Sequence, residues 1–237
     1  MSNDLTVFIG WDSREDIAYQ VAKASILRHN PNVNVQPLKL YELREKGLYT
    51  RDVDAAGSTE FTISRFLAPL MCDYKGYSVF MDCDMVLTTD IANIMKEADL
   101  SKTVNCVQHD YEQFDELSDV KMDGKVQAHY PRKNWSSVML FNNAKCTELT
   151  KDYVNKATPK ELHRMMWADE DIGELHHRWN YLAGYYNDDD YSIIHWTDGG
   201  PWFDNYRDCP LNEIWYNELF HLYGVHGRYE RTMEFVK

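Results

Sequence analysis

Short apolar runs and one amphipathic segment alternate over the first forty residues. The run from Leu5 to Ile9 predicts a β-strand that ends at Gly10. Apolar residues at helical spacing follow as far as His29; Ser13 is the expected cap, and Pro31 ends this helix. A second strand is predicted from Val33 to Leu40. This order is typical of a nucleotide-binding α/β layer, and ordinary α/β packing explains it equally well.

The next segments predict a loop, two helices and a strand. Residues 42–60 are polar and contain two glycines, so we expect a long loop. A helix is predicted from Thr62 to Leu70, with Arg65 on the side opposite its apolar face. Asp90 is the expected cap of a short helix from Ile91 to Ala98, and Thr103 to Gln108 predicts another strand.

The later part of the chain begins with a polar, irregular stretch, Asp110 to Lys133, which we expect on the surface. Trp135 to Phe141 then predicts a strand, and Thr158-Pro159-Lys160-Glu161 has the sequence of a helix start. Ser192 to His195 predicts a late strand that leads into a loop, Trp196 to Trp202. Glycines beside tryptophans suggest that the backbone of this loop approaches a ligand closely.

The stretch from Tyr77 to Asp90 carries the clearest chemical signal. Val79, Phe80 and Met81 form the apolar run of a buried strand, and Asp82 and Asp84 follow it. Side chains alternate along a strand, so both carboxylates should point the same way, about 6–7 Å apart. Two like charges this close to a core repel each other unless a cation lies beside them. A hard divalent ion, Mg²⁺ or Mn²⁺, with a phosphate group as its guest, is the simplest answer.

Two later groups extend this hypothesis. His195 ends the late strand just before the glycine loop, so we select it as a third metal ligand, although such histidines are more often structural. The acids Asp169-Glu170-Asp171 would usually form a solvated surface, but here they directly follow the apolar residues Met165, Met166 and Trp167. We therefore keep them as candidate site residues.

Composition and charge exclude some classes of function. The chain has 237 residues, no internal repeat and no linker-like boundary, so residues 1–237 are expected to form a single domain. Its net charge of −13, without a basic cluster, argues against binding to nucleic acids or anionic membranes. Within an acidic protein, a bound metal would supply the positive charge that an anionic substrate needs.

The cysteines and the hydropathy of the chain indicate the cellular compartment in which the protein is expected. The five scattered cysteines contain no C-x-x-C pair, which argues against a disulfide framework and against a zinc site. We find no signal-peptide pattern and no apolar stretch approaching the ~20 residues of a membrane span. A soluble protein in a reducing, cytoplasmic environment is expected.

Together, these blocks resemble the family 8 glycosyltransferases, the group that includes glycogenin and bacterial lipopolysaccharide galactosyltransferases. The resemblance runs roughly from Thr6 to Trp202 and depends on the order and spacing of several short motifs. The motifs are the opening strand and turn, Ser64-Arg65-Phe66-Leu67, Met81-Asp82-Cys83-Asp84, Ser137 to Asn142, Asp169-Glu170-Asp171, Trp179-Asn180, Ile194-His195-Trp196, Gly199 and Pro201-Trp202.

The resemblance implies a GT-A fold, a three-layer α/β/α arrangement around a mixed, mostly parallel sheet. It also implies Mn²⁺ (or Mg²⁺), a nucleotide-sugar donor, with a UDP-sugar favoured, and a glycan or other hydroxyl acceptor; a homodimer stays open. The implied metal ligands are Asp82, Asp84 and His195, and the implied catalytic residues are Asp169, Glu170 and Arg65. The implied donor-binding residues are Ile9, Gly10, Trp11, Asp12, Arg14, Arg65, Asp82, Cys83, Ser136, Ser137, Gly199, Gly200 and Trp202.

The sequence departs from the family pattern at three motifs. The terminal motif is one residue shorter and lacks the lysine that contacts the donor diphosphate, so Arg65, Arg14 or another base would substitute. Glu170 stands where an amide is usual, and Trp135-Ser136-Ser137 replaces Asn-Ala-Gly. The resemblance implies retention of anomeric configuration. We favour same-face attack, with Glu170 orienting or stabilising, over a covalent intermediate on Glu170.

Other functions fit part of the pattern. A haloacid-dehalogenase-type phosphatase would use Asp82 as nucleophile and Asp84 as acid/base, but its motif normally ends the first strand of the core. A nucleotidyltransferase would need a basic, glycine-rich loop after the first strand, which is absent. A non-catalytic nucleotide-sugar-binding relic also stays open, because the diphosphate lysine is missing.

Overall fold

The computed structural model describes residues 5–52, 59–110 and 132–224, and these contain two β-sheets and seven α-helices. The strands are β1 (Leu5–Gly10), β2 (Asn34–Leu38), β3 (Tyr77–Met81), β4 (Met85–Leu87), β5 (Val104–Val107), β6 (Val138–Asn142), β7 (Ile172–Leu175), β8 (Tyr181–Leu182) and β9 (Ile193–His195). The α-helices are α1 (Asp16–His29), α2 (Leu40–Glu45), α3 (Ala68–Met71), α4 (Ile94–Glu97), α5 (Lys151–Lys156), α6 (Pro159–His163) and α7 (Asn212–Leu222).

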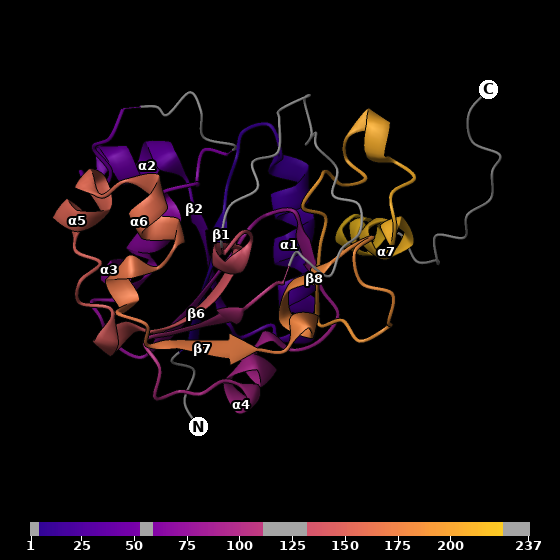
Figure 1. Cartoon of the computed structure of the whole chain (residues 1–237). Helices are drawn as coiled ribbons and strands as arrows, with labels where there is room; N and C mark the ends of the chain where they lie inside the picture. Colours follow the sequence, from indigo (N-terminus) through magenta and orange to yellow (C-terminus); the bar gives the residue numbers. More distant parts are fainter. Residues whose placement is uncertain (1–4, 53–58, 111–131, 225–237) are drawn as a thin grey trace.

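The larger sheet has six strands in the order β2-β1-β3-β6-β5-β7. Only β6 runs against its neighbours, so the sheet is mixed and mostly parallel, as the sequence predicts. The central strands are nearly continuous apolar runs because helices cover both faces of the sheet. Figure 1 shows α2, α3, α5 and α6 grouped on one side of it and α1 with α7 on the other.

The smaller sheet has three strands in the order β4-β9-β8. It packs with α1 and α7 around a second apolar cluster, Val21, Val86, Ile194, Trp196 and Trp215. The chain passes from β3 in one sheet to β4 in the other within three residues, 82–84. These three residues therefore lie where the two sheets meet.

Several predicted elements are confirmed. The first strand, the α1 helix, the strand at 104–107 and the late strand at 193–195 lie within or close to their predicted ranges. Asp90 caps the helical turn that follows it by accepting a hydrogen bond from the Ala92 N–H. Thr158 and Glu161 form a complete capping box at the start of α6.

Two corrections concern the first sixty residues. Ser13 does not cap α1, which begins at Asp16; its hydroxyl instead donates to Glu60, 47 residues away. The predicted strand to Leu40 ends at Leu38, and the predicted loop from 42 contains part of α2. The leucines, glutamates and arginine of α2 favour a helix locally, and Leu43 is buried by the tertiary packing of α2.

Three more corrections bear on the site. The stretch from Tyr77 to Asp90 is two strands in different sheets, because β3 ends at Met81. The predicted helix at 62–70 is a 3₁₀ turn, Ser64–Leu67, followed by α3, and Arg65 is buried in it. The predicted strand at 135–141 begins with a 3₁₀ turn, Trp135–Ser137. Most of the surface stretch predicted at 110–133 lies outside the described residues.

No helix in the described part of the chain is long and apolar enough to cross a membrane. All five cysteines are free.

Candidate functional site

Strand register gathers the candidate residues at one edge of the larger sheet. β1 and β3 are parallel neighbours with Ile9 opposite Met81, so the chain leaves both strands at the same edge. The turn after β1 and residues 82–84 therefore lie side by side. β9 pairs antiparallel with β4, and its last residue, His195, lies opposite Met85, which places its ring beside Asp84.

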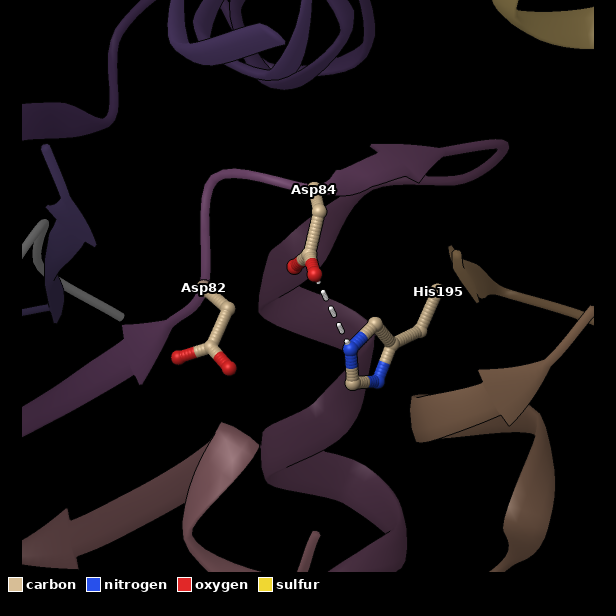
Figure 2. A group of neighbouring side chains, drawn as sticks. All are labelled: Asp82, Asp84 and His195. Carbon is tan, nitrogen blue, oxygen red and sulfur yellow. Dashed lines mark ion pairs between the residues drawn. The ribbon is translucent and has the colours of Figure 1, made fainter. Parts of the chain in front are cut away.

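Asp82, Asp84 and His195 converge on one point. Their ligand atoms all lie within 4.8 Å of one another, and Figure 2 shows both carboxylates and the imidazole ring pointing inwards. His195 Nε2 lies 3.4 Å from Asp84 Oδ2. All three side chains are nearly inaccessible to solvent, although residues 195 and 84 are more than a hundred positions apart.

The unsatisfied oxygens of this group fit a divalent cation. Asp82 Oδ1 and Asp84 Oδ1 are buried and have no hydrogen-bond partner among the described residues. Asp82 Oδ1 still has the charge of Arg65 2.9 Å away, so the cost of a buried carboxylate oxygen without a partner, at least about 1–3 kcal/mol, applies to Asp84 Oδ1. Two carboxylates and an imidazole are ligands that Mn²⁺ accepts readily, and Mg²⁺ favours the two oxygens.

The pKa of Asp82 also favours a bound cation. Burial raises the pKa of Asp82 to about 6; the charge of Arg65 opposes this rise, and the charge of Asp84 reinforces it. A carboxyl pKa this high means that the charged form lacks stabilisation in the protein as it stands. A bound cation would supply it.

Arg65 holds Asp82 in place. Its Nη1 lies 2.9 Å from Asp82 Oδ1 as an ion pair, but outside hydrogen-bonding geometry, and donates to the Ser136 carbonyl at 2.8 Å. Its guanidinium lies over the rings of Phe61 and Phe80, with centroids 5.3 and 4.8 Å away. The sequence expectation that Arg65 faces away from the apolar residues is therefore wrong: the tertiary fold buries it.

Ser136 and Ser137 lie in the 3₁₀ turn that contacts Arg65 and Asp82. The Ser137 carbonyl accepts a hydrogen bond from the Asp82 N–H at 3.0 Å. The hydroxyl of Ser136 is 2.8 Å from His163 Nδ1, and burial lowers the pKa of His163 to about 3, so this ring is neutral. Cys83, between the two aspartates, is buried.

The predicted donor residues at the end of β1 and in the turn after it already have partners within the protein. Ile9 is fully buried in the core, and a side chain at Gly10 would overlap the ring of Phe61 at 2.3 Å. Asp12 accepts two hydrogen bonds from the Arg14 side chain, at 2.9 and 2.8 Å. Trp11 donates to Asp16 at 2.7 Å. Donor contacts for these residues stay predictions.

The glycine loop reaches the same edge. Gly199 has φ +130°, a conformation that favours glycine, and a side chain on Gly200 would overlap the ring of Trp202 at 2.0 Å. Trp202 Nε1 donates to Glu15 at 3.1 Å. Burial raises the pKa of Glu15 to about 8, and the charges of Asp84 and Asp12 add to the rise.

Asp169 and Glu170 lie on the surface, both in left-handed backbone conformations with φ of 46° and 60°. Glu170 forms an ion pair with Arg132 at 3.2 Å, and its side chain is 83% exposed. Arg132 precedes Ser136 and Ser137 in the chain, so this ion pair connects Glu170 to the segment beside Asp82. The catalytic roles of Asp169 and Glu170 stay predictions.

Sequence reasoning missed four residues that surround the site: Glu15, Asn134, Asn180 and Thr197. Asn180 Oδ1 lies 2.8 Å from His195 Nδ1, and Asn134 donates to Thr197 at 3.0 Å. The only sequence signal was the Trp179-Asn180 motif, whose role could not be assigned without the fold. Glu15 carried no signal, because an acidic residue at a helix start is usually explained by the helix dipole.

With the geometry established, comparison with known proteins places the chain. No family model matches it. Protein CDI of Arabidopsis thaliana is 41% identical over 223 residues, which cover 90% of this chain and 85% of that protein. The chain belongs to the family of Protein CDI. The probable galacturonosyltransferase-like 7 of Arabidopsis thaliana is a more distant relative, 23% identical over 195 residues, which cover 69% of this chain and 53% of that protein.

Solved structures show the fold. The glycosyltransferase GlyE of Streptococcus pneumoniae TIGR4 superimposes with a TM-score of 0.58 at 16% identity, covering 90% of this chain but only 59% of GlyE. The galactosyltransferase LgtC, solved with donor and acceptor sugar analogues, gives a TM-score of 0.53 at 11% identity, covering 94% and 96% of the two chains. The fold is the GT-A fold of glycosyltransferases, as the sequence predicts.

Proposed function

We propose that this protein is a metal-dependent glycosyltransferase that moves a sugar from a nucleotide-diphosphate sugar to a hydroxyl group of a saccharide acceptor. The observation that carries the proposal is the convergence of Asp82, Asp84 and His195 within 4.8 Å. This group lies at the edge of the sheet where the parallel strands β1 and β3 end. In open α/β sheets, ligands bind outside the carboxyl ends of the strands. The GT-A fold and the distant galacturonosyltransferase-like relative support the same function.

Each residue has a role in this proposal. Asp82, Asp84 and His195 hold Mn²⁺ or Mg²⁺, which when bound neutralises charge on a nucleoside diphosphate leaving group. Arg65 keeps Asp82 in its ligating position through the 2.9 Å ion pair. The glycine loop at 199–200 and the turn at 9–14 form the two sides of the donor site; the hydrogen bond between Trp202 and Glu15 joins the residues just after each of them.

The finer assignments extend this proposal. We favour a UDP-sugar as the donor and retention of anomeric configuration. Same-face attack needs no protein nucleophile, and the exposed Glu170, 83% accessible and paired with Arg132, suits an orienting role better than a covalent one. Asp169 would hydrogen-bond the donor sugar. The cytoplasmic location expected from the cysteines stays a prediction.

The phosphatase alternative has less support in the structure. In that class the Asp-x-Asp motif follows the first core strand, whereas here it follows β3, and β1 ends at Gly10. The non-catalytic alternative fits the missing diphosphate lysine. It predicts nucleotide binding without turnover.

A thermal-shift screen tests the proposal. Nucleoside diphosphates and nucleotide sugars are each added with and without Mn²⁺, and donor hydrolysis is followed in parallel. We expect one nucleoside diphosphate to raise the unfolding temperature only when Mn²⁺ is present, and its sugar conjugate to be hydrolysed. Turnover that persists in excess EDTA would refute metal dependence, and hydrolysis of an aryl phosphate with Mg²⁺ would favour the phosphatase. Binding without hydrolysis or transfer would favour the non-catalytic protein.

A further inference from the structure

A buried chain of amide and hydroxyl groups lies behind His195. Asn180, fully buried, ends the 3₁₀ turn that precedes β8, and β8 pairs in parallel with β9, which ends at His195. Its Oδ1 is 2.8 Å from His195 Nδ1, and its Nδ2 donates to the Asn134 carbonyl at 3.0 Å. Asn134 Nδ2 donates in turn to Thr197 Oγ1 at 3.0 Å.

Hydrogen-bond chemistry fixes the direction of this chain. A backbone carbonyl can only accept, so the group of Asn180 that faces Asn134 must be its NH₂. The oxygen of Asn180 therefore faces His195. An amide oxygen can only accept as well, so His195 Nδ1 must carry a hydrogen.

We infer that Asn180 is a positioning residue that holds His195 in the Nδ1–H tautomer, so that the Nε2 lone pair faces Asp82 and Asp84. This inference deepens the proposed metal site and rests on it. Nε2 is the nitrogen 3.4 Å from Asp84 Oδ2, so the tautomer presents a ligand lone pair to the two carboxylates. Groups that orient a metal-binding histidine through its other nitrogen typically affect metal affinity about 10–100-fold.

The Asn134 carbonyl links both halves of the site. Besides the Asn180 side chain, it accepts a hydrogen bond from the Ser137 N–H at 3.2 Å. The Ser137 carbonyl in turn accepts from the Asp82 N–H. Asn134 has φ +61°, a left-handed conformation that asparagine tolerates better than most residues. One short turn thus sets the position of the first aspartate and, through Asn180, the orientation of the histidine.

Asn143 offers a matched control. It is also fully buried, its Oδ1 accepts from Ser78 at 2.7 Å, and its Nδ2 donates to the Lys75 carbonyl at 2.8 Å. It lies next to Asn142, which pairs with Tyr77 at the start of β3, the end of the strand remote from Asp82. Asn143→Leu should therefore remove two buried side-chain hydrogen bonds, as Asn180→Leu does, and destabilise the fold without affecting the metal site.

The first experiment measures Mn²⁺ affinity by calorimetry for the wild type, Asn180→Leu, Asn180→Asp and Asn143→Leu. We expect Asn180→Leu to weaken Mn²⁺ binding about 10–100-fold. Asn180→Asp keeps an acceptor facing Nδ1, and its second oxygen can face the Asn134 carbonyl only as a protonated O–H, so it should bind Mn²⁺ more tightly than Asn180→Leu but less tightly than the wild type. Asn143→Leu should bind like the wild type. Equal affinities for Asn180→Leu and Asn143→Leu would overturn the inference.

The second experiment reads the tautomer directly. Long-range ¹H–¹⁵N correlation spectra of the metal-free wild type, recorded at increasing pH until the ring carries a single hydrogen, identify which nitrogen holds it. The His195 signals are assigned by their loss in His195→Gln. We expect an Nδ1–H pattern, and an Nε2–H pattern would overturn the inference whether or not the variants fold. A wild type with the Nδ1–H pattern but no Mn²⁺ binding would refute the metal site and leave the tautomer assignment standing.

Discussion

Two of the Asp-x-Asp segments of the chain, Asp82–Asp84 and Asp169–Asp171, have sharply different surroundings. Asp82 and Asp84 are each 13% exposed, and each has a buried oxygen without a hydrogen-bond partner among the described residues. Asp171, at the end of the Asp169–Asp171 segment, is 31% exposed and receives hydrogen bonds from Lys145 at 2.6 Å and Thr103 at 2.9 Å. The hydrogen bonds from Lys145 and Thr103 hold the pKa of Asp171 well below its usual range.

The Asp-x-Asp motif alone therefore does not define a cation site. The Asp171 carboxylate already has protein cations as partners and ties the start of β7 to β5. The Asp82–Asp84 pair has one arginine and one histidine for two buried carboxylates. A divalent cation would supply the positive charge that the Asp82–Asp84 pair lacks, whereas the Asp171 carboxylate already has its cationic partners.

The largest expected effect separates the two segments directly. Asp84→Ala removes a proposed ligand, so Mn²⁺ affinity should fall by more than about 100-fold, beyond the loss expected for residues that only orient ligands. Donor hydrolysis and transfer should disappear together. Asp171→Ala is the matched control and should bind Mn²⁺ like the wild type. The two variants are compared by calorimetry and by donor turnover; equal losses in both would erase the distinction between the segments.

The next effect concerns the cations that pair with each segment. Arg65→Met leaves Asp82 buried without its partner, and removing one partner of a buried ion pair typically destabilises a protein by about 3–5 kcal/mol. Lys145→Met at the exposed Asp171 should change the free energy of unfolding by less than about 1 kcal/mol. Urea unfolding of the metal-free proteins measures both. A small effect for Arg65→Met would mean that its ion pair with Asp82 contributes little to the fold.

A third prediction uses the buried acid beside the pair. The folded-state pKa of Glu15, about 8, lies above its ordinary value of 4.5, so folding favours the protonated carboxyl. Wild-type stability relative to Glu15→Gln should therefore be unaffected below pH 4.5, fall as the pH rises towards 8, and be constant above it. The total change should be up to about 5 kcal/mol, because each pH unit between the two pKa values contributes about 1.4 kcal/mol. Urea unfolding of the metal-free proteins between pH 4 and pH 9 tests this, and parallel stability curves would show that Glu15 is charged in the folded protein.

The smallest expected effect is at the exposed segment. Glu170→Gln keeps the size of the side chain and removes its charge, so turnover should stay within about threefold of the wild type if Glu170 only orients groups. A fall of several hundredfold, with a trapped sugar adduct on Glu170 detected by mass spectrometry in the wild type, would instead identify a covalent nucleophile.

The sequence predicts the parts of this site that depend on strand ends. The apolar run before Asp82 and the late strand before His195 are both local signals, and both strands form where they are predicted. The alternation of side chains along a strand is nevertheless the wrong reason for the convergence of the two aspartates. Strand alternation does not apply to them, because β3 ends at Met81 and residues 82–84 cross between sheets.

The remaining parts depend on contacts between distant segments. Asn180 meets His195 because β8 pairs with β9, and this register cannot be read from either strand alone. Arg65 was expected on a helix face away from the core, but the 3₁₀ turn and the rings of Phe61 and Phe80 bury it. Ser13 has the sequence of a cap but bonds to Glu60 instead. In each case the tertiary fold overrides a local preference.

Pulsed electron paramagnetic resonance of bound Mn²⁺ shows whether His195, Asp82 and Asp84 hold the ion. The wild-type protein, loaded with one equivalent of Mn²⁺, should show a coupling to one nitrogen nucleus, because His195 Nε2 is a ligand together with the carboxylates of Asp82 and Asp84. In His195→Gln this coupling should disappear. Mn²⁺ held only by oxygen in the wild type, or no bound Mn²⁺ at all, would contradict the account.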